Sequence, residues 1–356
     1  MNLGDRMHNL QLSEDQEMIV DTVRKYVADV VAGKAQEHDE HRTYAADEFA
    51  GLAELGVFGL CVGEEAGGAG MGLVPFVAAL EAVGMHSSSL AALWIGQVQS
   101  ALALEAAAAA QVGDVVGGAE KAAFVGPEHG LVLASGRISG RARVVVGGGE
   151  ATQFVVAAVE NGAPVLAVVA ATAIERTPLL ALGLASAACT AVTFANSQAT
   201  VVATGAAAIA AIRKAQVAGW IGTAATAVGG AQGSITVARK HAAERIAFGK
   251  PLLVQEAVQR KLVEARRAAD AARHLAWHAA RVADLGQDAT EAAIGARLMA
   301  VDAMVAAADE GIQILGGFGY VVEYHVERHY RDGKMFDVLD GGGEALRNRL
   351  AAMQFA

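Results

Sequence analysis

The sequence contains few cysteines and few aromatic residues for its length. Only two cysteines, Cys61 and Cys189, occur far apart in 356 residues, which argues against a disulfide framework and favours a reducing cytoplasm. Aromatic residues make up 5% of the chain and hydrophobic residues 54%. The core must therefore consist of Ala, Val and Leu. This composition favours closely packed helices, because alanine is the best helix former.

Positive charge and long apolar runs are also scarce. The net charge of −10 argues against nucleic acid and anionic membrane surfaces as partners. Residues 177–212 are uncharged, but small polar residues interrupt them and no apolar run is long enough to span a bilayer. We interpret this stretch as buried strands that enter a helix. The opening MNLGDRMHNL has no apolar run, so we expect no signal peptide.

Helical patterns fill the N-terminal third of the chain. Ser13 and Gln16 form a capping-box pattern before SEDQEMIVDTVRKYVADVV, a second helix fits ADEFAGLAELGVFGL, and helical sequence runs from about residue 74 to residue 110. Between them, GEEAGGAGMG at 63–72 follows a helix and lacks the spacing of a dinucleotide loop. We interpret it as a connecting loop.

A β-rich segment separates these helices from a second helical region. Residues 121–203 are rich in Val, Thr and Gly and contain short apolar runs typical of strands. From about residue 205 the helical pattern returns, with two long helices near 254–285 and 289–315. The sequence predicts a mostly α chain with a central β-domain. The predicted domains are residues 1–118, 119–205 and 206–356.

Three possible chemical motifs have simpler structural interpretations. His274 and His278 have metal-ligand spacing on a helix but no third ligand nearby, so we favour an ordinary helix face and predict no metal site. In HVERHYRD, which contains His325 and His329, an ion-pair network is favoured over a metal site. Residues 87–89 are serines, but no base or oxyanion hole for a nucleophile is identifiable.

Three other stretches carry clearer candidates for function. In ERIAFGKPLL, Arg245 can pair with a phosphate and Phe248 can pack on a ring, although the stretch taken alone favours an ordinary turn between two helices. In IQILGGFGY, Gln313 precedes Gly316 and Gly317, whose backbone N–H groups can face an anion, and a helix C-cap explains this stretch equally well. Near the C-terminus, Asp340 is followed directly by three glycines, which allow a backbone with positive φ beside a carboxylate.

Together these pieces resemble the acyl-CoA dehydrogenase family of flavoproteins over nearly the whole chain. LSEDQEMI, LAELGVFGLCVGEEAGGAGMG, ERIAFGKPL and above all IQILGGFGYVVEYHVERHYRDGK carry the resemblance. It implies an N-terminal helical domain, a small β-barrel or sandwich and a C-terminal four-helix bundle. It also implies FAD bound between two subunits, an acyl-CoA substrate, an acceptor like electron-transfer flavoprotein, and an oligomer, with a dimer of dimers expected.

The resemblance places the residues of each flavin half separately. Arg245, Phe248, Gln313, Gly316 and Gly317 fall at positions that hold the diphosphate and adenosine of a neighbouring subunit's flavin. Two departures in that half are Ala247 and Glu256, each where Gln is common in the family.

The chain's own half of the flavin site is eroded. The family's Gly-Ser-Asp is missing from VGPEHGLVLASG, Val144 replaces a ring-contacting Trp, and Val146 replaces a hydroxyl that bonds the flavin. A valine side chain has no hydrogen-bonding group to offer the ring.

The resemblance also implies a carboxylate base, which occupies one of two family positions. The helix position aligns near Gly219, where no acid stands and the following residue is Trp220. The loop position aligns with Asp340, in place of a Glu, followed by Gly341 and Gly342 where the family has Gly-Thr. Asp340 is therefore the catalytic candidate. Its side chain is one methylene shorter, and a misplacement of about 1 Å can cost on the order of 10²-fold in rate.

Three hypotheses remain open at this point. The chain is a self-sufficient acyl-CoA dehydrogenase that uses Asp340, a subunit that donates Arg245 and its neighbours to a flavin held by another chain, or a structural protein without flavin. Random decay would erode both halves of the flavin site alike, whereas here the half used in trans is retained. That pattern favours the donating subunit.

Overall fold

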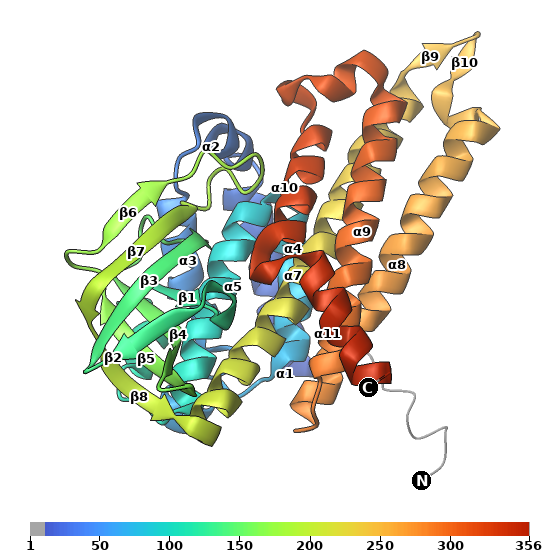
Figure 1. Cartoon of the computed structure of the whole chain (residues 1–356). Helices are drawn as coiled ribbons and strands as arrows, with labels where there is room; N and C mark the ends of the chain where they lie inside the picture. Colours follow the sequence, from blue (N-terminus) through green and yellow to red (C-terminus); the bar gives the residue numbers. More distant parts are fainter. Residues whose placement is uncertain (1–10, 356) are drawn as a thin grey trace.

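The computed structural model describes residues 11–355, and the N-terminal stretch examined for a signal peptide lies outside them. The described elements follow the predicted order of helices, strands and helices (Figure 1). The first helical group comprises α1 (Glu14–Tyr26), α2 (Ala35–His41), α3 (Ala46–Glu54), α4 (Leu73–His86), α5 (Ser88–Ala106) and α6 (Val112–Val116). The last comprises α7 (Gly205–Glu244), α8 (Glu256–Asp284), α9 (Thr290–Leu315), α10 (Val326–Val338) and α11 (Gly343–Phe355).

Local sequence signals explain the first helices. The capping box is confirmed: Ser13 Oγ accepts from the Gln16 N–H at 3.2 Å, and Gln16 Oε1 accepts from the Ser13 N–H at 3.0 Å. Ser87 caps α5 by accepting from the Leu90 N–H, which gives that serine a structural role. Helix α2 was not predicted, because its sequence AQEHDEH has no apolar periodicity.

The glycine-rich segment at 63–72 is a connecting loop, as predicted. It leads from α3 into α4, and the first N–H groups of α4 are already bonded by a side chain from α8. Asp284 accepts from the N–H groups of Leu73 and Val74 at 2.7 and 3.1 Å. An anion therefore finds no free helix N-terminus at this loop.

The central strands form one hydrogen-bonded sheet with the path β6-β7-β3-β2-β4-β5-β8, and β1 pairs with β4. No pairing joins the edge strands β6 and β8 among the described residues, so the sheet is not closed into a barrel. It curls around its own apolar core, which contains Phe154 and Phe194. The strands are β1 (Ala122–Val125), β2 (Leu131–Ala134), β3 (Arg137–Val145), β4 (Gln153–Glu160), β5 (Ala163–Ala170), β6 (Glu175–Pro178), β7 (Thr190–Gln198) and β8 (Thr200–Thr204).

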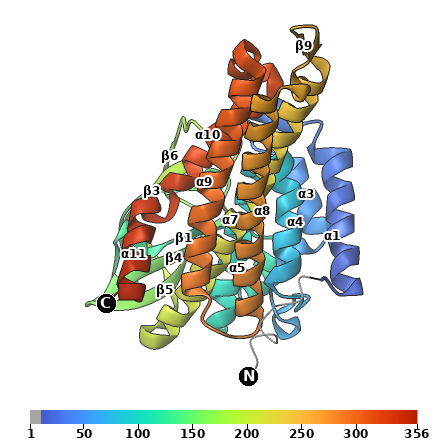
Figure 2. The ribbon, with the colours of Figure 1, turned by 90° about the vertical axis from the view of Figure 1, so that its right-hand side faces the viewer.

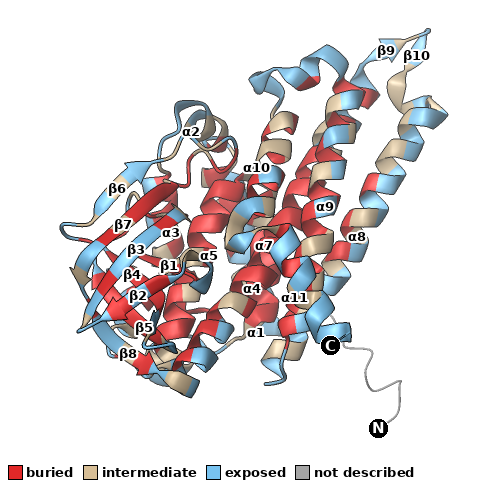
Figure 3. Cartoon of the chain, in the orientation of Figure 1, coloured by how far each residue is buried: buried red, intermediate tan, exposed pale blue. Residues whose placement is uncertain are grey.

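The C-terminal helices form a bundle that the sheet flanks on one side. Helices α7, α8 and α9 pack along their lengths, α10 packs on α9 and α7, and α4 lies against α7 and α8 (Figure 2). The buried residues run continuously through α4, α5 and α7, while the upper ends of α7–α9 are exposed (Figure 3). There the short hairpin of β9 (Ile246–Ala247) and β10 (Lys250–Pro251) joins α7 to α8.

The structure also bears on the cysteines, on possible metal ligands and membrane spans, and on the ion pairs of HVERHYRD. Cys61 and Cys189 are both free thiols. Within residues 11–355, no group of three or more His, Cys, Asp or Glu side chains could hold a metal ion, and no helix is long and apolar enough to cross a bilayer. The predicted ion-pair network in HVERHYRD is confirmed, because Arg331 pairs with Asp39 at 2.6 Å and with Glu327 at 2.5 Å.

Glycine allows α4 and α7 to approach closely, which yields a stability prediction. A Cβ on Gly229 would lie 2.3 Å from the Glu81 carbonyl oxygen and 2.8 Å from the Met85 nitrogen. Because both atoms belong to the α4 backbone, we expect Gly229→Ala to lower the free energy of unfolding by about 2 kcal/mol. Urea denaturation measures the change.

The matched control is Gly295→Ala in α9, where a Cβ meets no atom within 4 Å. That variant should be neutral or stabilising by about 0.5–1 kcal/mol, because glycine in a helix interior is unfavourable relative to alanine. Equal effects of the two substitutions would contradict the close approach of α4 and α7.

Candidate functional site

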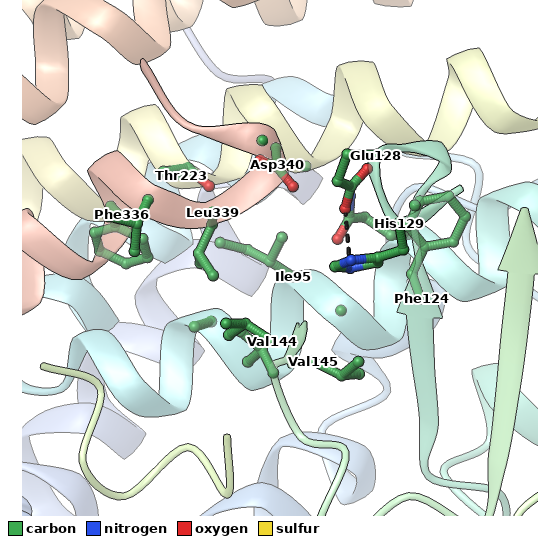
Figure 4. A pocket seen from close by; sticks show the side chains of 18 of the residues that line it. Ile95, Phe124, Glu128, His129, Val144, Val145, Thr223, Phe336, Leu339 and Asp340 are labelled. Atoms are coloured by element: carbon green, nitrogen blue, oxygen red, sulfur yellow. Dashed lines mark ion pairs between the residues drawn. The ribbon is translucent and has the colours of Figure 1, made fainter. Parts of the chain in front are cut away.

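A cleft of about 370 Å³ lies between the sheet, α5, α7 and the segment that joins α10 to α11. Asp340, Val144, Val146 and Gly219, which the sequence comparison with the family singled out separately, all line it. Figure 4 shows Glu128 and Asp340 on one side of the cleft and Val144 and Val145 across from them. Its walls combine polar groups with apolar side chains, among them Ile95, Phe124, Phe336 and Leu339.

Asp340 is held by a buried arginine that the sequence analysis missed. Arg297 of α9 is 1% exposed, and its guanidinium lies 3.4 Å from Asp340 Oδ2. The same group donates to the carbonyl oxygens of Phe336 and Leu339 at 2.7 and 2.9 Å. Arg297 thus fixes the connection that carries Asp340, whose backbone has φ 57°. The sequence feature that could have pointed to Arg297 is its place as a single arginine inside the apolar run AAIGARLMAV.

Glu128 and His129 form a second polar group in the cleft, also missed from the sequence. They belong to the 3₁₀ turn η5 (Pro127–His129), which follows β1. The Glu128 backbone is exposed, but its side chain points inward, remains 22% exposed, and lies 3.3 Å from His129 Nε2. Because Glu128 and Asp340 are far apart in the sequence, no local motif joins them. Only the acid-and-histidine pair in VGPEHG could have drawn attention.

Burial and neighbouring charges shift the pKa values of both η5 side chains. Burial, and secondly the charge of Asp340, raise the pKa of Glu128 to about 7, against a smaller opposing effect of Arg297. Burial lowers the pKa of His129, and Arg143 at the cleft wall adds to this, while Asp340 acts in the opposite direction. At neutral pH the imidazole is uncharged, and Glu128 is divided between its acid and its carboxylate.

The residues of this cleft do not fit a flavin ring. The ring needs hydrogen-bond partners along its polar edge and gains negative charge on reduction. Val144 and Val146 offer no hydrogen-bonding side chain, and Glu128 places a second carboxyl group beside Asp340 at the polar end of the cleft. Asp340 stands at the position where the sequence comparison expects a base, so Glu128 is the additional acid in this space.

A second hollow, of about 520 Å³, lies at the exposed end of the bundle. Arg245, Gly316 and Gly317 line it together, although Arg245 ends α7 and the two glycines follow α9. No carboxylate within residues 11–355 forms an ion pair with Arg245. Gly316 has φ 61°, a backbone that favours glycine, and a Cβ on Gly317 would meet open space. This set of donors fits a diphosphate.

The other two predicted residues of this group lie outside the wall of the hollow. Phe248 occupies the turn between β9 and β10 and is 95% exposed, and Gln313 is exposed on the last turn of α9. Tyr320 is 85% exposed nearby. In Figure 1 this end of the bundle, marked by β9 and β10, is well separated from the Asp340 region near α10 and α11. Asp340 and Arg245 therefore line two separate hollows of the chain.

Comparisons with known proteins identify the family of this chain. The family models "Acyl-CoA dehydrogenase, N-terminal domain" and "Acyl-CoA dehydrogenase, C-terminal domain" match residues 13–113 and 210–354. The short-chain specific acyl-CoA dehydrogenase, mitochondrial, of Bos taurus is 41% identical over 129 residues, 36% of this chain and 31% of that protein. The acyl-CoA dehydrogenase of Bacillus subtilis (strain 168) is 39% identical over 129 residues, 36% of this chain and 34% of that protein.

The matched segment thus spans about a third of the length of these relatives. Among solved structures, butyryl-CoA dehydrogenase from Megasphaera elsdenii superposes with a TM-score of 0.89. The superposition covers 97% of this chain and 99% of that one at 22% identity. At this identity the likeness establishes the shared fold.

Proposed function

The chain belongs to the acyl-CoA dehydrogenase family, and from that premise we propose that it is a subunit that donates its bundle end to a flavin site completed by another chain. In the assembly, FAD would oxidise an acyl-CoA thioester at its α,β-bond and pass electrons to an acceptor like electron-transfer flavoprotein. This chain would supply Arg245, Gly316 and Gly317 to the diphosphate, with Phe248 and Gln313 beside them. We place the assembly in the cytoplasm.

One observation carries the proposal: an arginine that has no ion-pair partner among residues 11–355 shares a hollow with two unobstructed glycines at an exposed apolar end of the molecule. Phe248 and Tyr320, at 95% and 85% exposure, leave large apolar surfaces in water unless another chain covers them. The cleft in the same chain lacks the groups that a flavin ring requires. A donating subunit is expected to keep residues that fit the diphosphate of a flavin and to lack residues that fit its ring.

Flavin content tests the proposal directly. The chain purified alone should lack the visible flavin absorbance, and co-expression with a neighbouring homologue that retains the ring-binding strand should give a yellow complex. Arg245→Ala should lower the flavin bound by that complex at least 10-fold, because a charge-assisted contact to the diphosphate is lost. Arg213→Ala is the control, since Arg213 is an exposed arginine of the same helix, with side chain exposure of 51%.

The other two hypotheses predict different flavin contents for the chain alone and for the co-expressed pair. Stoichiometric flavin in the chain alone would contradict the proposal and support a self-sufficient enzyme, a candidate that Asp340 favours because it lines the cleft. A colourless product both alone and with the homologue would support a structural protein without flavin.

A further inference from the structure

The cleft contains two carboxyl groups that differ in what they contact. Asp340 faces Arg297, which is buried and bonded at the same time to the carbonyl oxygens of Phe336 and Leu339. Within residues 11–355 no arginine forms an ion pair with Glu128, whose carboxyl group lies 3.3 Å from His129 Nε2. Asp340 is therefore committed to an ion pair that holds the loop, whereas the Glu128 carboxyl group remains available to a ligand.

The surroundings of Glu128 combine apolar walls with a few charges. A Cβ on Gly341 would lie 3.6 Å from the Glu128 Cβ, so the two acidic segments are in contact. The charged and titratable groups around Glu128 are His129 on its own turn, Asp340 after α10, Arg297 of α9 and Arg143 of β3. Apolar side chains such as Val144, Ile95 and Phe336 line the remaining space, which suits an acyl chain better than a strongly hydrated ligand.

We propose that Glu128, not Asp340, is the proton-transferring carboxylate of this cleft, and that it reversibly removes the α-proton of an acyl thioester without any flavin. The inference rests on one element of the proposed function, that the substrate class is an acyl thioester. It goes beyond that function by giving the chain's own cleft an activity. Asp340 and Arg297 act through Glu128 and are positioning residues.

The step conserves atoms and electrons. The α-proton moves from carbon to a Glu128 carboxylate oxygen, and the C–H electron pair forms the bond between the α-carbon and the carbonyl carbon. The carbonyl π pair moves to oxygen and gives an enolate, whose charge the Arg143 guanidinium can offset at the cleft wall. Return of a proton from Glu128 restores the thioester. Exchange of that proton with solvent between the two steps introduces deuterium in D₂O.

The protonation state of Glu128 suits this role. A base works best when its pKa lies near the working pH, and that of Glu128 is about 7, raised by burial and by Asp340. The exchange rate should therefore rise with pH through about 7, as Glu128 becomes ionised. Replacing Asp340 with asparagine removes the neighbouring negative charge, so the rise should then occur at lower pH.

The experiment follows deuterium incorporation at C2 of butyryl-CoA in D₂O by mass spectrometry, with the full chain purified alone and free of flavin. We expect incorporation by the natural chain, a loss of at least 100-fold in Glu128→Gln, and retained incorporation in Asp340→Asn with its pH profile moved down. Glu128→Asp, one methylene shorter, should lose on the order of 10²-fold. Glu344→Gln, at a carboxylate with 84% side-chain exposure, is the control and should behave as the natural chain does.

Several results would overturn the inference. They are no incorporation by the natural chain, undiminished exchange in a folded Glu128→Gln, abolished exchange in Asp340→Asn, or an unmoved pH profile in Asp340→Asn. Thermal melts establish that each variant is folded. If Glu128→Gln does not fold, Glu128→Asp provides the test in its place. A negative exchange result would not decide the proposed function. Deuterium exchange is measured with the flavin-free chain alone, whereas the proposed function is tested by the flavin absorbance of a two-chain complex.

Discussion

Arg297→Met should lower the free energy of unfolding by about 3–5 kcal/mol. Arg297 is 1% exposed and bonds two carbonyl oxygens at the end of α10, those of Phe336 and Leu339, as well as Asp340. Methionine fills a similar length but has no N–H group to donate. Two carbonyl groups at the helix end are then left without partners, in a place that water reaches poorly. Urea denaturation monitored by circular dichroism gives the value.

Arg347→Met is the matched control for this prediction. Arg347 on α11 pairs with Asp302 and Glu344 at 3.4 and 3.2 Å, but its side chain is 41% exposed. Exposed ion pairs contribute about 0–1 kcal/mol, so this variant should differ little from the natural chain. A similar cost for the two arginines would mean that burial and the carbonyl contacts of Arg297 contribute nothing.

Acidification from pH 7.5 to pH 4.5 should destabilise the natural chain more than His329→Leu. The difference between their free energies of unfolding should shift by about 3 kcal/mol in favour of His329→Leu. His329 of α10 is 2% exposed, its Nδ1 has no hydrogen-bond partner, and its pKa is lowered to about 3 by burial and by nearby cations, Arg328 first. The unfolded chain binds a proton below its ordinary pKa of 6.5, whereas the folded chain does not. Stability is therefore lost as pH falls below 6.5, at about 1.4 kcal/mol per pH unit.

Asp332, one turn further along α10, acts in the opposite sense. Burial raises its pKa to about 6, so the folded chain binds that proton more tightly and gains stability as pH falls below 6. Because Asp332 is present in both chains, its contribution cancels in the comparison. Denaturant melts at the two pH values provide the test, and His274→Leu, at an exposed histidine, controls for the loss of a histidine as such. An identical acid sensitivity in His329→Leu and the natural chain would refute the prediction.

Much of the fold could be predicted because it depends on local patterns. The capping box at Ser13 and Gln16, the long periodic runs of α8 and α9, and the change to Val- and Thr-rich strands after residue 121 all depend on neighbours within one element. The order of helices, strands and helices follows from these signals. Helix α2 escaped prediction because its seven residues present no apolar stripe.

The residues that line the hollow at the end of the bundle could also be singled out from sequence, since they belong to short motifs. Arg245 precedes a glycine turn, and Gly316 and Gly317 follow a helix that they terminate. That these parts meet around one hollow required the fold, because Gly316 lies 71 positions after Arg245.

The sequence by itself determined the family, the type of each long element, and Asp340 as the carboxylate of the loop after α10. The tertiary structure alone decided what surrounds Asp340, because it brought Arg297 from α9 to that loop and Glu128 from the turn after β1 to the same cleft. The sequence spacing of Arg297 and Glu128 from Asp340 does not predict that either residue lies near it. Burial and the charge of one carboxyl group acting on the other exist only once the chain has folded, and these two effects raise the pKa of Glu128.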